Sequence, residues 1–387
     1  MGTPNKMGRN SGWPSTVWVD SVFVMLTWAI GIALYFNCDS TCYPIRADSV
    51  KYFEAAENFS AGRGLVHSPH SPIPYDQNLE PLKLWPPGLP LLIAALSYLG
   101  IDPYYSAVWI PRASWLLATP IAVCVFRSLG IRLVAGPLAL LTMLSDGVFG
   151  SSTTVLSDVP YLLFTLLCFL FFFYAIKTDA NIFFAISSGL SAAAAYSVRN
   201  VGLSLVLAIP FTLIILVLLR MADRRHASQL LALWIGGAIP IVVALKARSM
   251  LVFGTLEPYS MEPSTVGIIH NIRWMMFGIL DDLSGVSRLS EEIAWTRWWF
   301  AATALAGSFA FLMLSGKWFL EQMKTDATQK GALGLALGVY CAGGTALVIL
   351  ARSRYEWGEL INCRHAGQYN LFVLALCAAG LGLLQET

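Results

Sequence analysis

The chain has 387 residues, of which 56% are hydrophobic and only 12% are charged, and its mean hydropathy is +0.63. A soluble domain cannot hide that much apolar surface, so the composition excludes a water-soluble globular protein. The formal net charge of +2 argues little about binding partners, and we expect no nucleic acid among them. The class that remains is a helical protein embedded in a lipid bilayer.

Apolar runs long enough to cross the ~30 Å hydrocarbon layer recur along the whole chain. The first run is too long for a signal peptide and has no small-residue cleavage site after it, so we expect a retained span. The sequence predicts an all-α polytopic protein with about ten transmembrane helices. These are expected at residues 17–36, 107–126, 133–149, 159–176, 182–198, 201–219, 230–247, 298–314, 332–351 and 369–384.

Basic residues in the short loops set the expected topology. They alternate along the predicted spans, and the positive-inside rule places them in the cytoplasm together with both termini. This holds only if residues 86–100, apolar but short for a span, lie in the outer interface without crossing. The basic loop residues are Arg127, Arg132, Lys177, Arg220, Arg224, Arg225, Lys317, Lys324 and Lys330.

The domain organisation follows from this topology. Residues 1–16 form a cytoplasmic amino terminus, and residues 17–384 form a single transmembrane domain. Its outer loops are 37–106, 248–297 and 352–368, and none is long enough for a separate soluble domain of typical size.

The first outer loop contains the most informative polar residues. Residues 49–61 predict a short amphipathic helix that Gly62 and Gly64 would end. Asp48 stands immediately before it, where an aspartate is a favoured helix cap. A carboxylate held there beside the bilayer is also suited to act as a general base on an acceptor hydroxyl, and the two roles are compatible.

Asp158 opens a second helix at the same face, with Pro160 two positions later. Capping is again the default interpretation. The alternative is that Asp48 and Asp158 converge and hold either an acceptor or a divalent cation.

Basic residues at the outer face run against the positive-inside tendency. Arginine suits bidentate phosphate binding and lysine a point-charge contact, whereas a single residue is more simply explained by snorkelling to a headgroup. His67 and His70 lack a third ligand at diagnostic spacing, so we predict no metal ligand set. The outer basic residues that we consider as phosphate ligands are Lys83, Arg199, Arg364 and His365.

Several motifs are missing from the sequence. It has no Walker loop and no dinucleotide fingerprint, which argues against a nucleotide-driven pump or a soluble-type redox enzyme. No nucleophile-elbow serine motif occurs. Charged residues are scarce in the span centres, where a proton-coupled carrier needs them.

The order of the outer-loop motifs resembles that of the GT-C glycosyltransferases, most closely the branch of protein O-mannosyltransferases and lipid A aminoarabinose transferases. The resemblance covers most of the chain in order. It is carried by Asp48…Tyr52…Ala55-Ala56, Gly62-Arg63-Gly64, Trp85-Pro86-Pro87-Gly88, Leu156-Ser157-Asp158-Val159-Pro160, Tyr196-Ser197-Val198-Arg199-Asn200 and Arg364-His365-Ala366-Gly367.

The resemblance implies two juxtamembrane helices in the first outer loop and a lipid-phosphate-linked sugar as donor. Asp48 matches the family's first catalytic carboxylate, and Tyr52 and Asp158 are assigned to an acceptor or metal site. The family's second acidic residue is replaced by Ser49, so any role of that residue has no support in this chain. Many relatives also carry a soluble domain after the last span, which this chain does not show.

These observations predict a glycosyltransferase that moves a sugar from a polyprenyl-phosphate donor to a hydroxyl-bearing acceptor on the periplasmic face of a bacterial inner membrane. Asp48 is the general base of an inverting displacement. No cofactor is required, although a divalent cation is compatible with the reaction. The alternatives are a lipid-linked sugar flippase or other transporter, and a non-catalytic membrane subunit whose outer loop docks a partner.

Overall fold

The computed structural model describes residues 13–38, 47–69, 79–131, 134–256, 263–284, 328–355 and 363–386. Within these residues, six helices are long and apolar enough to cross a membrane, so the chain is a multi-pass helical membrane protein. These six are α1 (Trp13–Cys38), α4 (Pro103–Ser128), α6 (Asp158–Lys177), α8 (Leu203–Leu218), α9 (Arg224–Phe253) and α13 (Thr328–Arg354).

The remaining described elements are shorter or less apolar. They are α2 (Ala47–Ser60), α3 (Gly88–Tyr98), α5 (Ala135–Met143), α7 (Ile182–Val198), α10 (Ile268–Ser284) and α14 (Cys363–Glu386), with a π-helix η1 (Asp146–Gly150), a 3₁₀ helix η2 (Asn200–Gly202) and strands β1 (Val66–His67) and β2 (Glu80–Pro81). The two strands pair antiparallel, with Val66 opposite Pro81.

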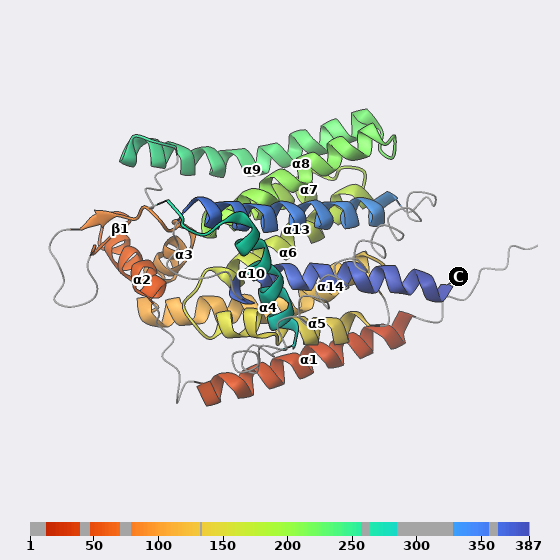
Figure 1. Ribbon diagram of the computed structural model, residues 1–387, viewed down its shortest axis with the longest axis horizontal. Coiled ribbons are helices and arrows are strands. Elements are labelled where there is room, and N and C mark those ends of the chain that lie inside the picture. The colour runs from red at the N-terminus through yellow and green to blue at the C-terminus, as the bar shows by residue number, and fades with distance from the viewer. Residues whose placement is uncertain are drawn as a thin grey trace, which may run out of the picture.

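The long helices lie side by side, and α2, α3 and β1 gather beyond one end of the bundle (Figure 1). We call α2, α3 and the two strands the cap, and this end the cap end. Helix α6 is the most deeply buried of the six candidate spans, because α4, α7 and α13 pack around it. Helices α1 and α9 lie at opposite edges of the bundle, and α10 crosses the other helices (Figure 1).

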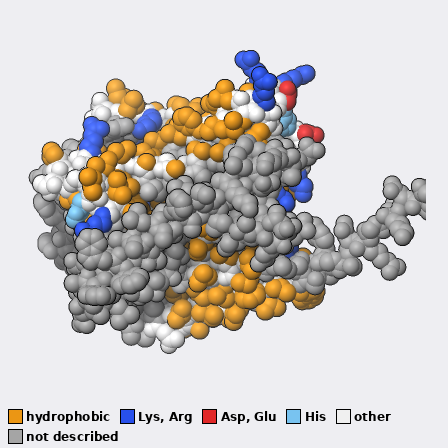
Figure 2. All heavy atoms as spheres, turned by 45° about the vertical axis from the view of Figure 1, so that its right-hand side comes forward, with side chains coloured by type: hydrophobic (Ala, Val, Ile, Leu, Met, Phe, Trp, Pro, Cys, Tyr) orange, Lys and Arg blue, Asp and Glu red, His pale blue; other side chains and the backbone are white. Residues whose placement is uncertain are grey.

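The surface agrees with a membrane-embedded bundle. Figure 2 shows that the described surface is largely hydrophobic and that its Lys and Arg side chains gather toward the ends of the bundle. Large apolar side chains are exposed along the edge helices, among them Trp18 and Phe36 on α1 and Leu251 on α9. Exposed apolar side chains of this kind are stable in contact with lipid tails, because the hydrocarbon layer contains no water.

Most of the predicted spans coincide with observed helices, but one is wrong in its extent. The run predicted at 133–149 contains only the nine-residue helix α5, followed by the π-helix η1. Ser145 adopts an extended conformation, with φ −61° and ψ 152°, and so stops α5 before η1 begins. The predicted span at 298–314 lies outside the described residues.

Helix α3 explains why residues 86–100 do not form a span. Its 11 residues are about 17 Å long, far short of the ~30 Å hydrocarbon layer. It packs instead on α2 and α4, and Leu89 and Ile93 are fully buried there. This matches the expected interfacial helix.

Helices α7 and α9 are in direct backbone contact. A Cβ atom added to Gly189 would overlap the carbonyl oxygen of Trp234, and one added to Gly237 would overlap that of Ile186. Small residues at such crossings let two membrane helices approach closely, and close packing is the main force that joins helices in lipid.

A buried ion pair joins three helices at the end opposite the cap. Asp20 on α1 is 5% exposed and pairs with Arg127 on α4. The same carboxylate accepts a hydrogen bond from the backbone N–H of Gly136 on α5, at 3.1 Å. The ion pair therefore attaches the edge helix α1 to α4, and removing either partner would leave a buried charge unpaired.

We expect the Asp20→Ala variant to lose about 3 kcal/mol of stability, because it leaves the Arg127 guanidinium without its carboxylate. Thermal unfolding of the purified protein in detergent measures this loss as a lower melting temperature. The double variant Asp20→Ala/Arg127→Met should recover most of it, since no unpaired charge remains. Equal melting temperatures for Asp20→Ala and the unchanged protein would show that the pair does not stabilise the fold.

Candidate functional site

Helix α2 is fixed against the segment that precedes α6. Ser49 donates a hydrogen bond to the carbonyl oxygen of Val155, at 2.9 Å. The helix begins at Ala47, so Asp48 lies inside its first turn. The prediction that Asp48 is the capping residue immediately before the helix is therefore wrong. The carboxylate still faces the positive end of the helix dipole. The helix ends as predicted, with Gly62 at φ 76° and Gly64 at φ 86°.

Tyr52, one turn after Asp48, connects α2 to the start of α6. Its side chain is 4% exposed, and its hydroxyl donates to Oγ of Ser157 at 3.2 Å. Burial raises the pKa of Tyr52 to about 12, with further upward contributions from the charges of Asp48 and Asp158. Both carboxylates therefore lie close enough to act electrostatically on one hydroxyl.

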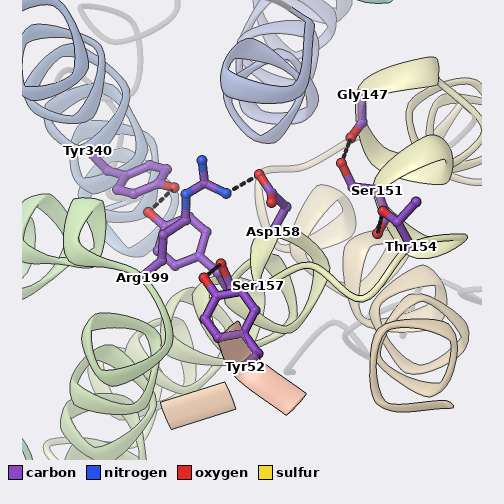
Figure 3. A network of polar contacts seen from close by, with 9 residues as sticks. Tyr52, Gly147, Ser151, Thr154, Ser157, Asp158, Arg199 and Tyr340 are labelled. Atoms are coloured by element: carbon purple, nitrogen blue, oxygen red, sulfur yellow. Dashed lines mark hydrogen bonds and ion pairs between the residues drawn. The ribbon is translucent and has the colours of Figure 1, made fainter. Parts of the chain in front are cut away.

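Asp158 and Arg199 form an ion pair between the ends of α6 and α7. Asp158 is 5% exposed, and the Arg199 guanidinium donates to its Oδ1. Figure 3 shows the guanidinium directed at Asp158, with Ser157 and the Tyr52 ring beside them. We call Asp48, Tyr52, Asp158 and Arg199 the carboxylate cluster. The Arg199 guanidinium therefore fixes the position of the Asp158 carboxylate within this cluster.

A groove that is open to solvent lies between the cap and the ends of α7 and α9. Its lining combines basic, aromatic and apolar side chains, and we call it the cationic groove. The residues that line it are Lys83, Trp85, Pro86, Pro87, Tyr196, Asn200, Leu245, Lys246, Arg248, Ser249 and Leu256.

The length of α9 explains how two cations reach this groove. Its 30 residues measure about 45 Å, more than the ~30 Å hydrocarbon layer, so an end of the helix projects past the lipid. Lys246 donates to the carbonyl oxygen of Leu256 at 3.3 Å, and its ammonium lies 5.9 Å from the centre of the Tyr196 ring. Arg248 donates to the carbonyl oxygen of Leu82 at 3.2 Å. Both contacts are to neutral groups, so both side chains keep their positive charge toward the groove.

The turn between α7 and η2 is a shared wall of the groove and the carboxylate cluster. Tyr196 and Asn200 line the groove, and Arg199 between them reaches Asp158. The groove and the carboxylate cluster are therefore connected through one turn of the chain.

The cap is held together by its own polar contacts. Lys51 and Glu54 on α2 bind the backbone carbonyl and N–H of Ser68, and the ring of His67 lies edge-on to Trp85 with centroids 5.8 Å apart. His67 therefore packs against Trp85, one of the residues that line the groove. His70, the other histidine considered as a metal ligand, lies outside the described residues.

Helix α10 contributes a buried carboxylate that the sequence did not point to. Asp282 is 4% exposed and accepts hydrogen bonds from the backbone N–H of Gly147 and from Nδ2 of Asn370, the latter at 2.7 Å. Burial raises the pKa of Asp282. This contact ties α10 to η1 and α14, and it is structural in character because both oxygens are occupied.

The predicted site residues thus divide into two groups and a remainder. Asp48, Tyr52, Asp158 and Arg199 form the carboxylate cluster, and Lys83 lies in the neighbouring groove. His365 is buried on α14 and is not among the residues that line the groove. The side chain of Arg364 lies outside the described part of the chain.

Sequence reasoning missed Lys246 and Arg248. Arg248 falls in the predicted outer loop, so the search for outer-face basic residues could have found it. Lys246 was assigned to the predicted span 230–247, which hid it.

The described residues do not fit a divalent cation. No three His, Cys, Asp or Glu side chains cluster among them in a way that could hold a metal ion. Asp158, which the sequence suggested as a ligand of a divalent cation, is bound by the Arg199 guanidinium. No step of the chemistry below is therefore assigned to a metal.

Comparison with known proteins gives this arrangement a precedent. A family model described as dolichyl-phosphate-mannose-protein mannosyltransferase matches residues 83–252, which include the groove-lining segment and the Asp158–Arg199 pair. Among curated proteins, no relative matches the chain.

Solved structures match almost the whole chain. The Archaeoglobus fulgidus oligosaccharyltransferase AglB, in complex with an inhibitory peptide and a dolichol-phosphate, is similar with a TM-score of 0.58 and 12% identity over 97% of this chain and 51% of that one. The same enzyme with zinc and sulfate gives 0.57 and 13% identity, covering 94% of this chain and 49% of that one. ArnT from Cupriavidus metallidurans, bound to undecaprenyl phosphate, gives 0.55 and 12% identity over 95% and 61%.

The chain has the fold of the AglB and ArnT structures. The resemblance drawn from the outer-loop motifs is confirmed at the level of the fold, and α2 and α3 are found where it implied two short helices. The chain spans about half the length of the archaeal GT-C enzyme and 61% of ArnT.

We expect the Tyr52→Phe variant to lose about 1 kcal/mol of stability at neutral pH, since it removes the hydrogen bond to Ser157. The raised pKa of Tyr52 adds a pH effect, because an unfolded tyrosine ionises near pH 10 and the folded one near 12. The protonated hydroxyl therefore stabilises the fold below pH 10, and this contribution is lost between pH 10 and about 12.

Thermal unfolding in detergent at pH 8, 10 and 11.5 measures both effects. The unchanged protein should lose more stability over this range than Tyr52→Phe. Parallel pH profiles for the two proteins would contradict the buried, bonded state of this hydroxyl.

Proposed function

We propose that this protein is a membrane glycosyltransferase that moves a sugar from a polyprenyl-phosphate donor to a hydroxyl acceptor. One observation carries the proposal: the cap end of the bundle holds both the carboxylate cluster and a groove lined by three cations and two aromatic rings. The matching family model and the lipid phosphates bound in the similar structures support it.

The cationic groove is suited to the phosphate of the donor. Lys83, Lys246 and Arg248 supply positive charge at the cap end of the bundle, and the apolar residues beside them suit the first isoprene units of the lipid. As the bond from the anomeric carbon to the phosphate oxygen breaks, negative charge grows on the departing lipid phosphate. Cations fixed at that position stabilise the charge when it develops, which lowers the barrier.

Asp48 is the proposed general base. It accepts the proton of the acceptor hydroxyl while the acceptor oxygen attacks the anomeric carbon. The new glycosidic bond forms as the bond to phosphate breaks, so the anomeric configuration inverts in a single displacement. Asp158 is held by Arg199, and we assign this pair to the positioning of the acceptor beside Tyr52 rather than to phosphate binding.

In this proposal the donor and acceptor meet at the periplasmic face of a bacterial inner membrane, where the positive-inside pattern of the basic loops places the cap. Of the two other residues that the sequence suggested as phosphate ligands, His365 is not among the residues that line the groove, and the side chain of Arg364 lies outside the described residues.

A flippase or other transporter of lipid-linked sugars is the first competing function. It also needs many spans and basic residues near a headgroup, but it gives Asp48 no role in proton transfer. A non-catalytic subunit is the second, and there Phe53, Phe59 and Trp85 of the cap would matter more than the carboxylate.

The Asp48→Asn variant separates these functions. We expect its transfer rate to fall at least about 100-fold, because an amide cannot accept the proton. Mass spectrometry of polyprenyl-linked sugars, in cells that lack the protein and carry either version at matched expression, measures the outcome. Accumulation of one lipid-linked sugar in the variant alone supports the transferase. Equal clearance by both versions contradicts it and favours a transporter.

The Lys246→Ala variant tests the groove. We expect the Kd for polyprenyl phosphate to rise about 10-fold or more, since a charge-assisted contact to phosphate is lost. Lys177→Ala is the matched control: Lys177 ends α6 at the opposite side of the bundle, and its ammonium lies 5.9 Å from the Tyr174 ring, as Lys246 lies 5.9 Å from Tyr196. Binding to the protein in nanodiscs is the measurement. Equal Kd values for the two variants would exclude the groove as the phosphate site.

A further inference from the structure

Asn200 holds a distinctive position at the junction of the groove and the carboxylate cluster. It is the first residue of η2, its side chain is exposed, and it lines the cationic groove. The next residue toward α7 is Arg199, which is bonded to Asp158. Asn200 is therefore the polar, uncharged residue on the wall that the two parts of the site share.

The backbone around Asn200 is tightly constrained. Gly202 donates its N–H to the carbonyl oxygen of Arg199 at 2.9 Å. A Cβ atom added to Gly202 would lie 2.6 Å from Cα of Tyr196, so only glycine lets the turn close this far. The turn between α7 and η2 thus has one compact shape.

Neighbouring helices fix the same turn from three directions. Arg199 is bound to α6 through Asp158, and the Lys246 ammonium of α9 lies over Tyr196. The first residue of α3, Gly88, packs on the carbonyl of Ser197, where an added Cβ atom would lie 2.5 Å from the oxygen. A side chain on such a scaffold is well placed for selective recognition, because little reorganisation is needed when a ligand binds.

The chemistry of the proposed reaction places the sugar beside this turn. This step rests on the proposed function: with the phosphate in the groove and the anomeric carbon facing Asp48, the sugar lies between the two, along their shared wall. A primary amide offers two donors and one acceptor, so one asparagine can bind two neighbouring hydroxyls of a sugar ring. The faces of Trp85 and Tyr196, which also line the groove, suit the C–H face of the ring.

We propose that Asn200 determines which sugar the enzyme accepts, by hydrogen bonding to ring hydroxyls of the lipid-linked donor. The ligand class is a neutral hexose linked to polyprenyl phosphate, and epimers that move one hydroxyl out of reach of the amide bind less well.

The test compares the unchanged protein, Asn200→Ala and Asn200→Gln in nanodiscs. The probes are polyprenyl phosphate without a sugar and polyprenyl phosphate linked to glucose, mannose or galactose. We expect the unchanged protein to prefer one epimer by about 10-fold or more, as the loss of one or two hydrogen bonds predicts. Asn200→Ala should bring the three Kd values within about threefold of each other. Asn200→Gln, which keeps the amide but moves it outward, should change the order of preference.

Asn181→Ala is the matched control. It removes an asparagine side chain at the start of α7, the end of that helix opposite to the turn that holds Asn200. There Asn181 accepts a hydrogen bond from the N–H of Phe183 at 3.0 Å. It should lower the melting temperature and leave sugar preference unchanged.

Two results would overturn the inference for different reasons. If the unchanged protein binds polyprenyl phosphate but its preference among the epimers is absent, or is the same in Asn200→Ala, the amide does not select the sugar and the proposed function still stands. If the unchanged protein does not bind polyprenyl phosphate at all, the proposed function fails and the role of Asn200 fails with it.

Discussion

A lipid bilayer offers no hydrogen-bond partner to the backbone, and this constraint decides where the protein can do chemistry. Irregular backbone is stable only where protein groups or water satisfy it. In the described part of the chain, the segment before α6 and the turn after α7 meet at the cap end, where Ser49, Tyr52 and Arg199 satisfy or brace them. The carboxylate cluster and the cationic groove lie at this end for the same reason, since charged side chains need water or a partner.

Opposite charges are arranged in two different ways in this fold. The Asp20–Arg127 pair closes on itself at the end away from the cap and serves to hold α1. The Asp158–Arg199 pair lies next to Asp48 and shares a wall with a groove that contains further cations. The Asp158–Arg199 contact fixes the positions of both side chains between α6 and α7. The pair therefore gives the site a fixed frame rather than its reactive group.

Sequence patterns predicted the elements whose cause is local. The cap helix α2 was expected at 49–61 and is found at Ala47–Ser60, because apolar spacing and two glycines define it. The third span was predicted too long, since average hydropathy does not register the interruption at Ser145. The pairing of Asp158 with Arg199, 41 residues apart, depends on how α6 and α7 pack. Lys246 escaped notice because it lies inside the predicted span 230–247, and hydropathy alone does not show where a helix leaves the lipid.

The two glycine contacts between α7 and α9 have a mechanical consequence. Helices whose backbones touch at Gly189 and Gly237 cannot slide or separate without breaking van der Waals contact along the crossing. Lys246 and Arg248 at the end of α9 and Arg199 at the end of α7 thus belong to a single stiff block. The opposite side of the groove, residues 83–87, is joined to this block at both ends, because Arg248 binds the carbonyl oxygen of Leu82 and Gly88 packs on Ser197. A ligand that enters the groove therefore lies between two walls whose spacing the α7–α9 block sets.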